Sequence, residues 1–440
     1  MIIKSFFATH VFGYMNFEIN FNKDKNFLVG KNGSGKTTAL KLINALIMPN
    51  FKELLKTQFS ECYLLLYIHG KEVCIYSYKR EDTLFFGVNS IEDVLEIPYR
   101  PDIVLEVKNR KDNRLEEFLE DINYKYRLHP VIEYISEIPS PVFLGLDRRT
   151  DCEKPNNDYF LEREAWLNIR KNNITRDRKI IEGSIGSGLM EIELLVKNAY
   201  KYIRDLEVEQ TQVLRNQILV SSFKYLNFNE NELFNISISK NERRKLLKRE
   251  SEIKKALINI VDFDSSINEE VDLFFKKLNS MFDGMSSENK YKIEFLLNKA
   301  QIERMYKIVD IIDEHKSRND DYYKPINDFL STINKFYQDS GKRLEIDTVG
   351  QLVVKIPDGK ESTIESLSSG ERQLLVIFAH SYFNQSNIFI IDEPEVSLHL
   401  GWQEKLADNI FLANTESQFI LATHSPEIIA GNKNKAVGCR

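Results

Sequence analysis

The apolar residues near both ends of the chain come in short runs that predict β-strands. Two of these runs, residues 27–29 and 388–391, are uninterrupted and predict buried strands of a parallel sheet. Further short strand-like segments lie at residues 64–67, 73–76, 84–88 and 143–146. The sequence His69-Gly70-Lys71 predicts a hairpin turn between the first two of these. Together the runs predict that both ends of the chain contribute β-strands to the fold.

The middle of the chain has the longer period of amphipathic helices. From Ile192 the apolar residues recur at alternating spacings of four and three over three heptads, and the polar Gln210 takes one of these positions. Further helices are predicted at about residues 241–261, 288–316 and 326–336. The pattern is typical of a coiled coil or a long bundle helix. An ordinary helical domain is the alternative, because three heptads are the lower limit for predicting a coiled coil.

These patterns divide the chain into three parts. Residues 1–154 and 321–440 are expected to form the two lobes of one α/β head, and residues 155–320 a helical insertion between them. A chain of 440 residues is long enough for two or three such structural units.

One segment carries specific chemistry. Residues 30–38 match the pattern Gly-x-x-x-x-Gly-Lys-Thr between the strand at 27–29 and a helical run at 39–47. Backbone N–H groups of such a loop surround phosphate oxygens, and the start of the following helix adds partial positive charge. Lys36 is expected to reach the β- and γ-phosphates, and the Thr37 hydroxyl to bind Mg²⁺. The predicted nucleotide-binding residues are Gly30, Asn32, Gly33, Ser34, Gly35, Lys36, Thr37 and Thr38.

A pair of carboxylates, Asp392 and Glu393, follows the strand at 388–391. Ligands of open α/β sheets bind at the carboxyl ends of the strands, where this pair is expected to lie. Asp392 suits an outer or water-mediated contact with Mg²⁺, and Glu393 suits the general base that polarises an attacking water. Strands often end in acids, so the pair alone is weak evidence for a catalytic site. Together with the phosphate loop it is strong evidence.

Two further segments are less specific by themselves. Residues 367–371 read Leu-Ser-Ser-Gly-Glu and begin a helical run, in which Ser368 and Glu371 have the spacing of a capping box. Residues 419–426 predict a strand that ends in Thr-His-Ser. A single histidine such as His424 is usually structural.

The order of these four segments resembles the heads of ABC-class ATPases, most closely their chromosome-maintenance and recombination-repair branch. The resemblance implies a P-loop ATPase head with Walker A at 30–38, Walker B at 388–393, an antiparallel β layer and an inserted helical or coiled-coil domain. It also implies ATP and Mg²⁺ as cofactors, and a γ-phosphate contact for His424. Residues 397–399 fall where the family has its dimer-facing loop.

The same resemblance implies that two heads close over shared ATP, with the signature segment of one head facing the nucleotide of the other. The signature residues are Ser368, Ser369, Gly370 and Glu371. Ser369 replaces a glycine and Glu371 a glutamine that are common in transporter versions, and both changes are usual in repair and defence branches. The family's glutamine loop is not identifiable in this sequence.

Composition bears on the expected partners and cellular location of the protein. A net charge of −6 at pH 7 lacks the basic excess that points to nucleic acid. The four cysteines show no metal-type spacing and fit a reducing cytoplasm. No signal peptide is recognisable and no apolar stretch approaches the ~20 residues that span a bilayer, so we expect a cytoplasmic protein without a membrane partner. Arg148 and Arg149 either contact phosphate or a partner subunit, or are surface charges.

The organisation resembles the standalone ATPase subunits of anti-phage systems of the PARIS type, which we favour, and of the Septu type. This resemblance implies a slow ATPase that senses a phage-encoded trigger protein and holds or releases a separate TOPRIM-class nuclease. It also implies a homo-oligomer of head-to-head dimers, up to a hexamer. A DNA-repair or DNA-clamping ATPase is the alternative, and nucleic-acid binding stays open. A transporter motor is disfavoured, because it needs no helical insertion of this length.

Overall fold

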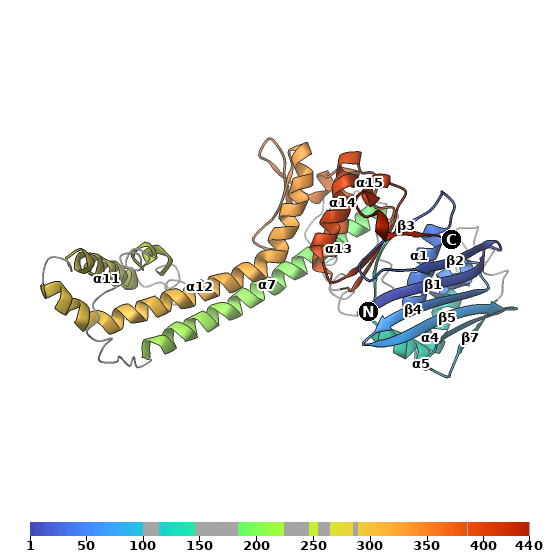
Figure 1. Cartoon of the computed structure of the whole chain (residues 1–440), viewed down its shortest axis with the longest axis horizontal. Coiled ribbons are helices and arrows are strands. Elements are labelled where there is room, and N and C mark those ends of the chain that lie inside the picture. Colours follow the sequence, from blue (N-terminus) through green and yellow to red (C-terminus); the bar gives the residue numbers. More distant parts are fainter. Residues whose placement is uncertain are drawn as a thin grey trace, which may run out of the picture. The chain divides into compact units, whose positions relative to one another are not determined.

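The chain forms two compact units (Figure 1). The computed structural model describes residues 1–99, 114–145, 184–223, 246–253, 265–284, 289–384 and 386–439. Unit 1 combines residues 1–197 and 328–440, and unit 2 consists of residues 198–327. Sheets and helices alternate in unit 1, and the described part of unit 2 is helical, which confirms the predicted fold class. Arg148, Arg149 and much of the helix expected at 241–261 lie outside the described residues.

Unit 1 contains a five-stranded parallel sheet with the spatial order β14-β3-β13-β12-β8. Its strands are β3 (Lys25–Val29), β8 (Val142–Leu144), β12 (Ile388–Asp392), β13 (Gln418–Ala422) and β14 (Ala436–Gly438). Because β3, β13 and β12 are neighbours and parallel, their carboxyl ends lie together at one edge. The phosphate loop, the acidic pair and the Thr-His-Ser segment all follow these three ends.

The two faces of this sheet pack into different cores, because successive side chains of a strand point to opposite sides. Ile388 and Ile390 belong to a core shared with helix α1 and the antiparallel sheet. Phe389 and Ile391 belong to a second core, shared with helices α13 and α14. The helices that flank the sheet are α1 (Lys36–Ile47), α13 (Ser369–Phe383), α14 (Leu400–Ala413) and the short α15 (Pro426–Ile429).

A six-stranded antiparallel sheet has the order β2-β1-β4-β5-β6-β7. Its strands are β1 (Ile2–Val11), β2 (Met15–Asn20), β4 (Glu61–Ile68), β5 (Lys71–Arg80), β6 (Thr83–Val88) and β7 (Leu95–Pro98). His69 and Gly70, both at positive φ, join β4 to β5 and confirm the predicted hairpin. Helices α2 (Phe51–Lys56), α4 (Arg114–Tyr126) and α5 (Pro130–Glu137) contribute to the first core. Sequence analysis did not predict α4 and α5.

A small three-stranded sheet precedes the signature segment. It consists of β9 (Arg343–Ile346), β10 (Leu352–Lys355) and β11 (Glu361–Ser362), in the order β11-β10-β9. Three single 3₁₀ turns lie at Gln338–Ser340, Ile364–Ser366 and Lys433–Lys435. The first two turns bracket this sheet, so the sheet connects the long helix before it to the signature segment after it.

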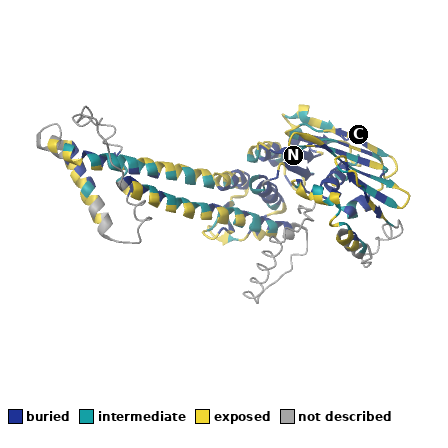
Figure 2. Cartoon of the chain, turned by 90° about the horizontal axis from the view of Figure 1, so that it is seen from below, coloured by how far each residue is buried: buried dark blue, intermediate teal, exposed yellow. Residues whose placement is uncertain are grey.

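Two long helices, α7 (Ser184–Phe223) and α12 (Asn289–Tyr337), each belong to both units, and α11 (Ser265–Gly284) lies in unit 2. Within unit 2, α7 and α12 run side by side (Figures 1 and 2). The polar Gln210 of the predicted seam accepts a hydrogen bond from Arg318 at 3.3 Å. Unit 2 also has a core of its own, made by Leu214, Ile218, Leu246, Ile253, Phe275, Leu278, Met281, Phe282, Phe295, Ile302, Ile308 and Ile312.

Helix α12 differs from the prediction of separate helices at 288–316 and 326–336. It continues through Pro325, although an internal proline loses a hydrogen bond and clashes with the preceding turn, at a cost of ~3 kcal/mol. Ile326 follows directly and is buried, and the next buried residues of the helix, Phe329 and Ile333, pack in the second core of unit 1. The division between the units falls beside this proline. The expected boundary at 154/155 lies outside the described residues.

Candidate functional site

The phosphate loop (residues 30–38) joins the end of β3 to the start of α1. Gly35 is the N-cap of α1 and has a φ of 86°, and Gly33 has a φ of 77°. Glycine adopts this left-handed region without strain. A Cβ atom at Gly35 would lie 2.6 Å from the ring of Phe17 in β2. Only glycine therefore allows both the turn of the loop and its close approach to the antiparallel sheet.

The Lys36 side chain folds back along the loop. Lys36 is the first residue of α1 and is 5 % exposed. Its Nζ donates to the Gly30 carbonyl at 3.1 Å and lies 2.6 Å from Nε2 of His424. The structure thus brings together the phosphate-loop lysine and the histidine that follows β13, which are 388 residues apart in sequence.

Acidic groups surround the Lys36 ammonium. Burial lowers the pKa of Lys36, and nearby acidic groups oppose that effect, among them Glu393, Asp392 and Glu395. Burial outweighs these charges, so the pKa of Lys36 lies below the ordinary value of a lysine. The predicted phosphate ligand and the predicted acidic pair therefore share one electrostatic environment.

Asp392 and Glu393 end β12 in different conformations. Asp392 closes the strand and is 1 % exposed. Glu393 has a φ of 45°, and its N–H donates to the Ala422 carbonyl of β13 at 2.8 Å. A positive φ is uncommon for a residue other than glycine, and such strained residues cluster at active sites. The bond to β13 fixes the point from which the Glu393 carboxylate leaves the sheet.

The switch loop (residues 423–425) follows β13. Thr423 and Ser425 are buried, and His424 between them is exposed. Oε1 of Glu395 accepts the N–H groups of His424 and Ser425 at 2.5 and 3.2 Å. Sequence analysis assigned no role to Glu395. No local pattern could have revealed this contact, because the two partners lie 29 residues apart.

The signature segment (residues 367–371) begins α13 with the predicted capping box. Ser368 Oγ accepts the N–H of Glu371 at 3.4 Å, and Glu371 Oε2 accepts the N–H of Ser368 at 2.7 Å. Ser368 is the N-cap of α13 and Ser369 is its first residue, and both are exposed. The predicted capping box of Ser368 and Glu371 is therefore confirmed. Their contact with a neighbouring nucleotide stays a prediction.

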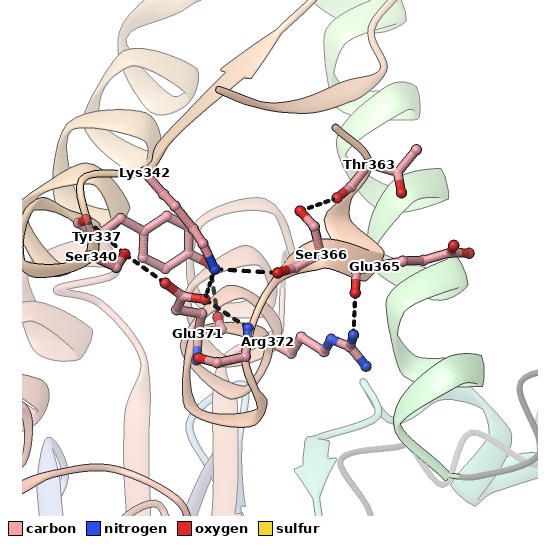
Figure 3. Close-up of polar contacts among 9 residues, drawn as sticks. Tyr337, Ser340, Lys342, Thr363, Glu365, Ser366, Glu371 and Arg372 are labelled. Carbon is pink, nitrogen blue, oxygen red and sulfur yellow. Dashed lines mark hydrogen bonds and ion pairs between the residues drawn. The ribbon is translucent and has the colours of Figure 1, made fainter. Parts of the chain in front are cut away.

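The Glu371 carboxylate is held inside its own head (Figure 3). It is 2 % exposed and accepts hydrogen bonds from Lys342 Nζ at 2.8 Å and Ser340 Oγ at 2.7 Å. Burial raises its pKa, but the bonds from Lys342, Ser340 and Ser368 outweigh burial and leave the pKa below its ordinary value. Tyr337, the last residue of α12, donates to the Glu371 carbonyl at 2.8 Å. The end of α12 is thus bonded directly to the signature helix.

Gly370 packs against residues 397–399, the segment that the family resemblance predicts to be the dimer-facing loop. A Cβ atom at Gly370 would lie 2.6 Å from the Ser397 carbonyl oxygen and 3.4 Å from the Trp402 ring. On the same helix, Gln373 Nε2 donates to the Pro394 carbonyl at 2.8 Å. The signature segment, the dimer-facing loop and the turn after the acidic pair therefore form one connected block.

Cys439 lies under the phosphate loop, which sequence analysis did not foresee. It follows the edge strand β14, and its N–H donates to the Val29 carbonyl at 3.0 Å. Its thiol donates to the Ser34 carbonyl at 3.6 Å. Burial raises the pKa of this thiol to about 11, so it supports the loop as a neutral group.

A family model described as "AAA ATPase domain" matches residues 13–429. This chain belongs to that AAA ATPase domain family. The match includes the phosphate loop, the acidic pair, the signature segment and the switch loop, and it spans both units.

Individual proteins similar to this AAA ATPase domain chain have also been found. The "Retron Vc95 probable ATPase" of Vibrio cholerae serotype O1 biovar El Tor is 26 % identical over 287 residues, which are 58 % of this chain and 52 % of that protein. "Endonuclease GajA" of Bacillus cereus strain VD045 is 32 % identical over 78 residues, 16 % of this chain and 14 % of that protein. The chain spans about half the length of the first relative and less of the second.

Solved structures similar to this AAA ATPase domain chain include two SMC head domains. The head of Pyrococcus furiosus Smc, with an extended coiled coil and bound to the C-terminal domain of ScpA, has a TM-score of 0.41 and 14 % identity, and the match covers 99 % of this chain and 93 % of that one. The SMC head domain from Thermotoga maritima has a TM-score of 0.34 and 11 % identity, with coverages of 99 % and 92 %.

ATPases of this family act on a nucleotide and typically use Mg²⁺, and the donors present fit that ion. Thr37 and Asp392 both offer oxygen, the element that Mg²⁺ prefers. Among the described residues no group of three or more His, Cys, Asp or Glu side chains could hold a metal by itself. None of the described helices combines the length and apolarity needed to cross a bilayer.

Proposed function

We propose that this chain is an ATP-hydrolysing switch whose heads associate in pairs over ATP. The observation that carries the proposal is the meeting of Lys36 and His424, at 2.6 Å, beside the carboxyl end of β12. Lys36 donates, and a histidine ring nitrogen can accept from it or donate to a phosphate, so the two nitrogens at one point suit the terminal phosphate of a nucleotide. Asp392 ends the adjacent strand and Glu393 follows it.

The residues divide the chemistry among them. Lys36 and His424 donate to the transferred phosphoryl group, whose oxygens carry the charge of the transition state. Glu393 orients the attacking water and accepts its proton, from a position fixed by the bond to Ala422. Thr37 and Asp392 would hold Mg²⁺, which would supply positive charge to offset that of the phosphate groups. Each of these groups stands at a strand end or a helix start, so the site is built on rigid elements.

The signature segment supports association in pairs. The Glu371 carboxylate is occupied within its own head, which fixes the start of α13 and leaves Ser368 and Ser369 exposed there. The start of a helix carries partial positive charge and orphan N–H groups, which attract an anion. A γ-phosphate held by the loop of a second head is the anion that we propose. Hydrolysis removes this shared contact and opens the pair.

The test uses Glu393→Gln, which keeps the shape of the side chain and removes the base. We expect ATP binding to persist, turnover to fall on the order of 10²- to 10⁴-fold, and a dimer to accumulate with ATP in light scattering. Glu404→Gln, at an exposed glutamate of α14, is the matched control and should turn over and associate like wild type. Adding Ser368→Arg to Glu393→Gln should abolish the dimer but leave ATP bound.

Two results would contradict the proposal. Wild-type turnover in Glu393→Gln removes this residue from the chemistry. A dimer that survives Ser368→Arg removes the signature segment from the contact between heads.

The cellular role that we propose is control of a separate effector nuclease in anti-phage defence, in a PARIS-type arrangement with a TOPRIM-class nuclease and a phage-encoded trigger. The similarity to a retron ATPase and to an endonuclease supports this choice. The net charge of −6 disfavours the alternative, a DNA-clamping or DNA-repair ATPase. In this view the chain works in the cytoplasm as a homo-oligomer built from head-to-head dimers, and the resemblance to PARIS-type subunits extends this proposal to a hexamer.

The experiment that separates the two roles is affinity capture of the Glu393→Gln chain from its native host, with and without ATP. A co-purifying nuclease whose amount changes with ATP supports effector control. Nucleic acid that is retained with ATP and lost at higher salt supports the clamp instead.

A further inference from the structure

We propose that Glu395 is a positioning residue that fixes the switch histidine, His424, for its contact with the terminal phosphate. This inference rests on the function proposed above. Glu395 has no part in the chemistry assigned to Asp392 and Glu393, and its carboxylate accepts hydrogen bonds from the backbone of the switch loop.

The first support is the pair of contacts that Glu395 makes. Its Oε1 accepts the N–H groups of two consecutive residues, His424 at 2.5 Å and Ser425 at 3.2 Å. Hydrogen bonds to an ionised acceptor are stronger than neutral ones, and two amides on one oxygen determine the direction of the peptide between them. Glu395 therefore sets the orientation of the backbone that carries the His424 imidazole.

The second support is the way the rest of the loop is held. The Ser425 N–H also donates to Thr423 Oγ1 at 3.0 Å, and Ser425 Oγ donates to Gln403 Oε1 at 2.8 Å. Gln403 in turn donates from Nε2 to the Leu398 carbonyl at 2.7 Å. These bonds secure the residues beside His424 and tie them to the dimer-facing loop. The imidazole itself is exposed and reaches Lys36.

The third support is the cost of this arrangement. Oε2 of Glu395 is buried and has no hydrogen-bond partner among the described residues. Burying a carboxylate oxygen without a hydrogen bond costs free energy, and the nearby charge of Lys36 offsets part of that cost. Residues that break a stability rule are expected where function requires them.

The test is a double-mutant cycle on ATP turnover. Glu395→Ala should lower kcat on the order of 10- to 100-fold, the effect of losing hydrogen bonds to a charged acceptor, and should change KM for ATP less than about threefold. Glu395→Gln keeps an oxygen acceptor and should recover most of the lost kcat. Because Glu395 acts through His424, the variant with both Glu395→Ala and His424→Ala should be no slower than His424→Ala alone.

Each outcome decides between named possibilities. If the double variant is slower than His424→Ala by the full Glu395→Ala factor, Glu395 acts independently and the inference is wrong, while the proposed function stands. If His424→Ala turns over like wild type, the proposed role of His424 is itself wrong. Equal turnover in Glu395→Ala and wild type also overturns the inference.

Folding is controlled separately. Glu404→Ala removes an exposed glutamate of α14 and should leave kcat unchanged. If Glu395→Ala does not fold, the same cycle is run with Glu395→Asp, whose side chain is one methylene shorter and withdraws the acceptor from the two amides while keeping its charge. A Glu395→Asp variant with wild-type kcat would then contradict the inference.

Discussion

Lys342 tests how strongly the signature helix is anchored. Its Nζ lies 2.8 Å from Glu371 Oε2, and the side chains are 19 % and 2 % exposed, respectively. Removing one partner of a buried ion pair costs ~3–5 kcal/mol, because the other charge is left buried. Two donors, Ser340 Oγ and the Ser368 N–H, remain on the carboxylate, and Lys342 is partly solvated. We therefore expect Lys342→Met to lower the free energy of unfolding by about 2–3 kcal/mol at pH 7.

The pH dependence of this loss follows from the pKa of Glu371. The folded state holds this pKa below the ordinary value of 4.5, so the ionised carboxylate stabilises wild type above that pH and loses its contribution as pH falls through the folded pKa. In Lys342→Met the largest lowering contact is gone and burial raises the pKa instead. The carboxylate of the variant then takes up a proton at a higher pH, which relieves the buried charge. The difference between the two proteins should shrink as pH falls from 7 towards 4.5.

The assay is urea unfolding followed by Trp402 fluorescence. Trp402 is 8 % exposed and its ring lies 3.4 Å from a Cβ built at Gly370, so it reports on the region around the signature segment. The other tryptophan, Trp166, is replaced by phenylalanine in every protein compared. Lys360→Met is the control, because Lys360 is 79 % exposed and pairs with Asp358 at 3.6 Å, and surface pairs contribute ~0–1 kcal/mol. Equal losses in Lys342→Met and Lys360→Met, or a loss that does not vary with pH, would refute the reasoning.

Two further predictions concern residues packed around α13. Gly370→Ala places a methyl group 2.6 Å from the Ser397 carbonyl and should lower the free energy of unfolding in urea by roughly 1–3 kcal/mol. The control Gly401→Ala, whose Cβ has its nearest contact at 3.5 Å, should be tolerated. Equal stabilities of the two variants would argue against tight packing at Gly370. Burial lowers the pKa of His380 to about 4 from 6.5, so the unfolded state binds more protons in that window and wild type should lose ~3 kcal/mol as pH falls from 6.5 to 4. His380→Leu should lack this part of the slope, and an unchanged slope would show that His380 is not its source.

The sequence predicted the parts of this protein whose signals are local. The phosphate loop, the apolar strand before Asp392 and the capping box of Ser368 and Glu371 each depend on residues a few positions apart. Periodicity also indicated the long helices. It did not foresee one continuous helix through Pro325, because the packing of Ile326 and Phe329 offsets a penalty that is visible in sequence.

The sequence could not predict the contacts that complete the site, because they join residues far apart in the chain. Glu395 meets the switch loop 29 residues away, and Lys342 meets Glu371 at the same separation. Cys439 reaches the phosphate loop from the far end of the chain, through a three-residue strand at the sheet edge. Such pairs are created by the tertiary arrangement of strands and helices, and a single sequence without periodic spacing carries no sign of them.

The signature helix α13 is hydrogen-bonded on two sides, to the end of α12 and to the turn after β12. These contacts would connect the two segments in the proposed switch. Residues two apart on a helix do not face each other, so Glu371 and Gln373 make their contacts in different directions. Glu371 meets the end of α12 and the start of β9, through Tyr337, Ser340 and Lys342. Gln373 meets Pro394, the residue between Glu393 and Glu395. Because packed helices shift as rigid bodies rather than deform, we expect a displacement at the end of α12 to reach the turn that carries Glu393, the proposed general base.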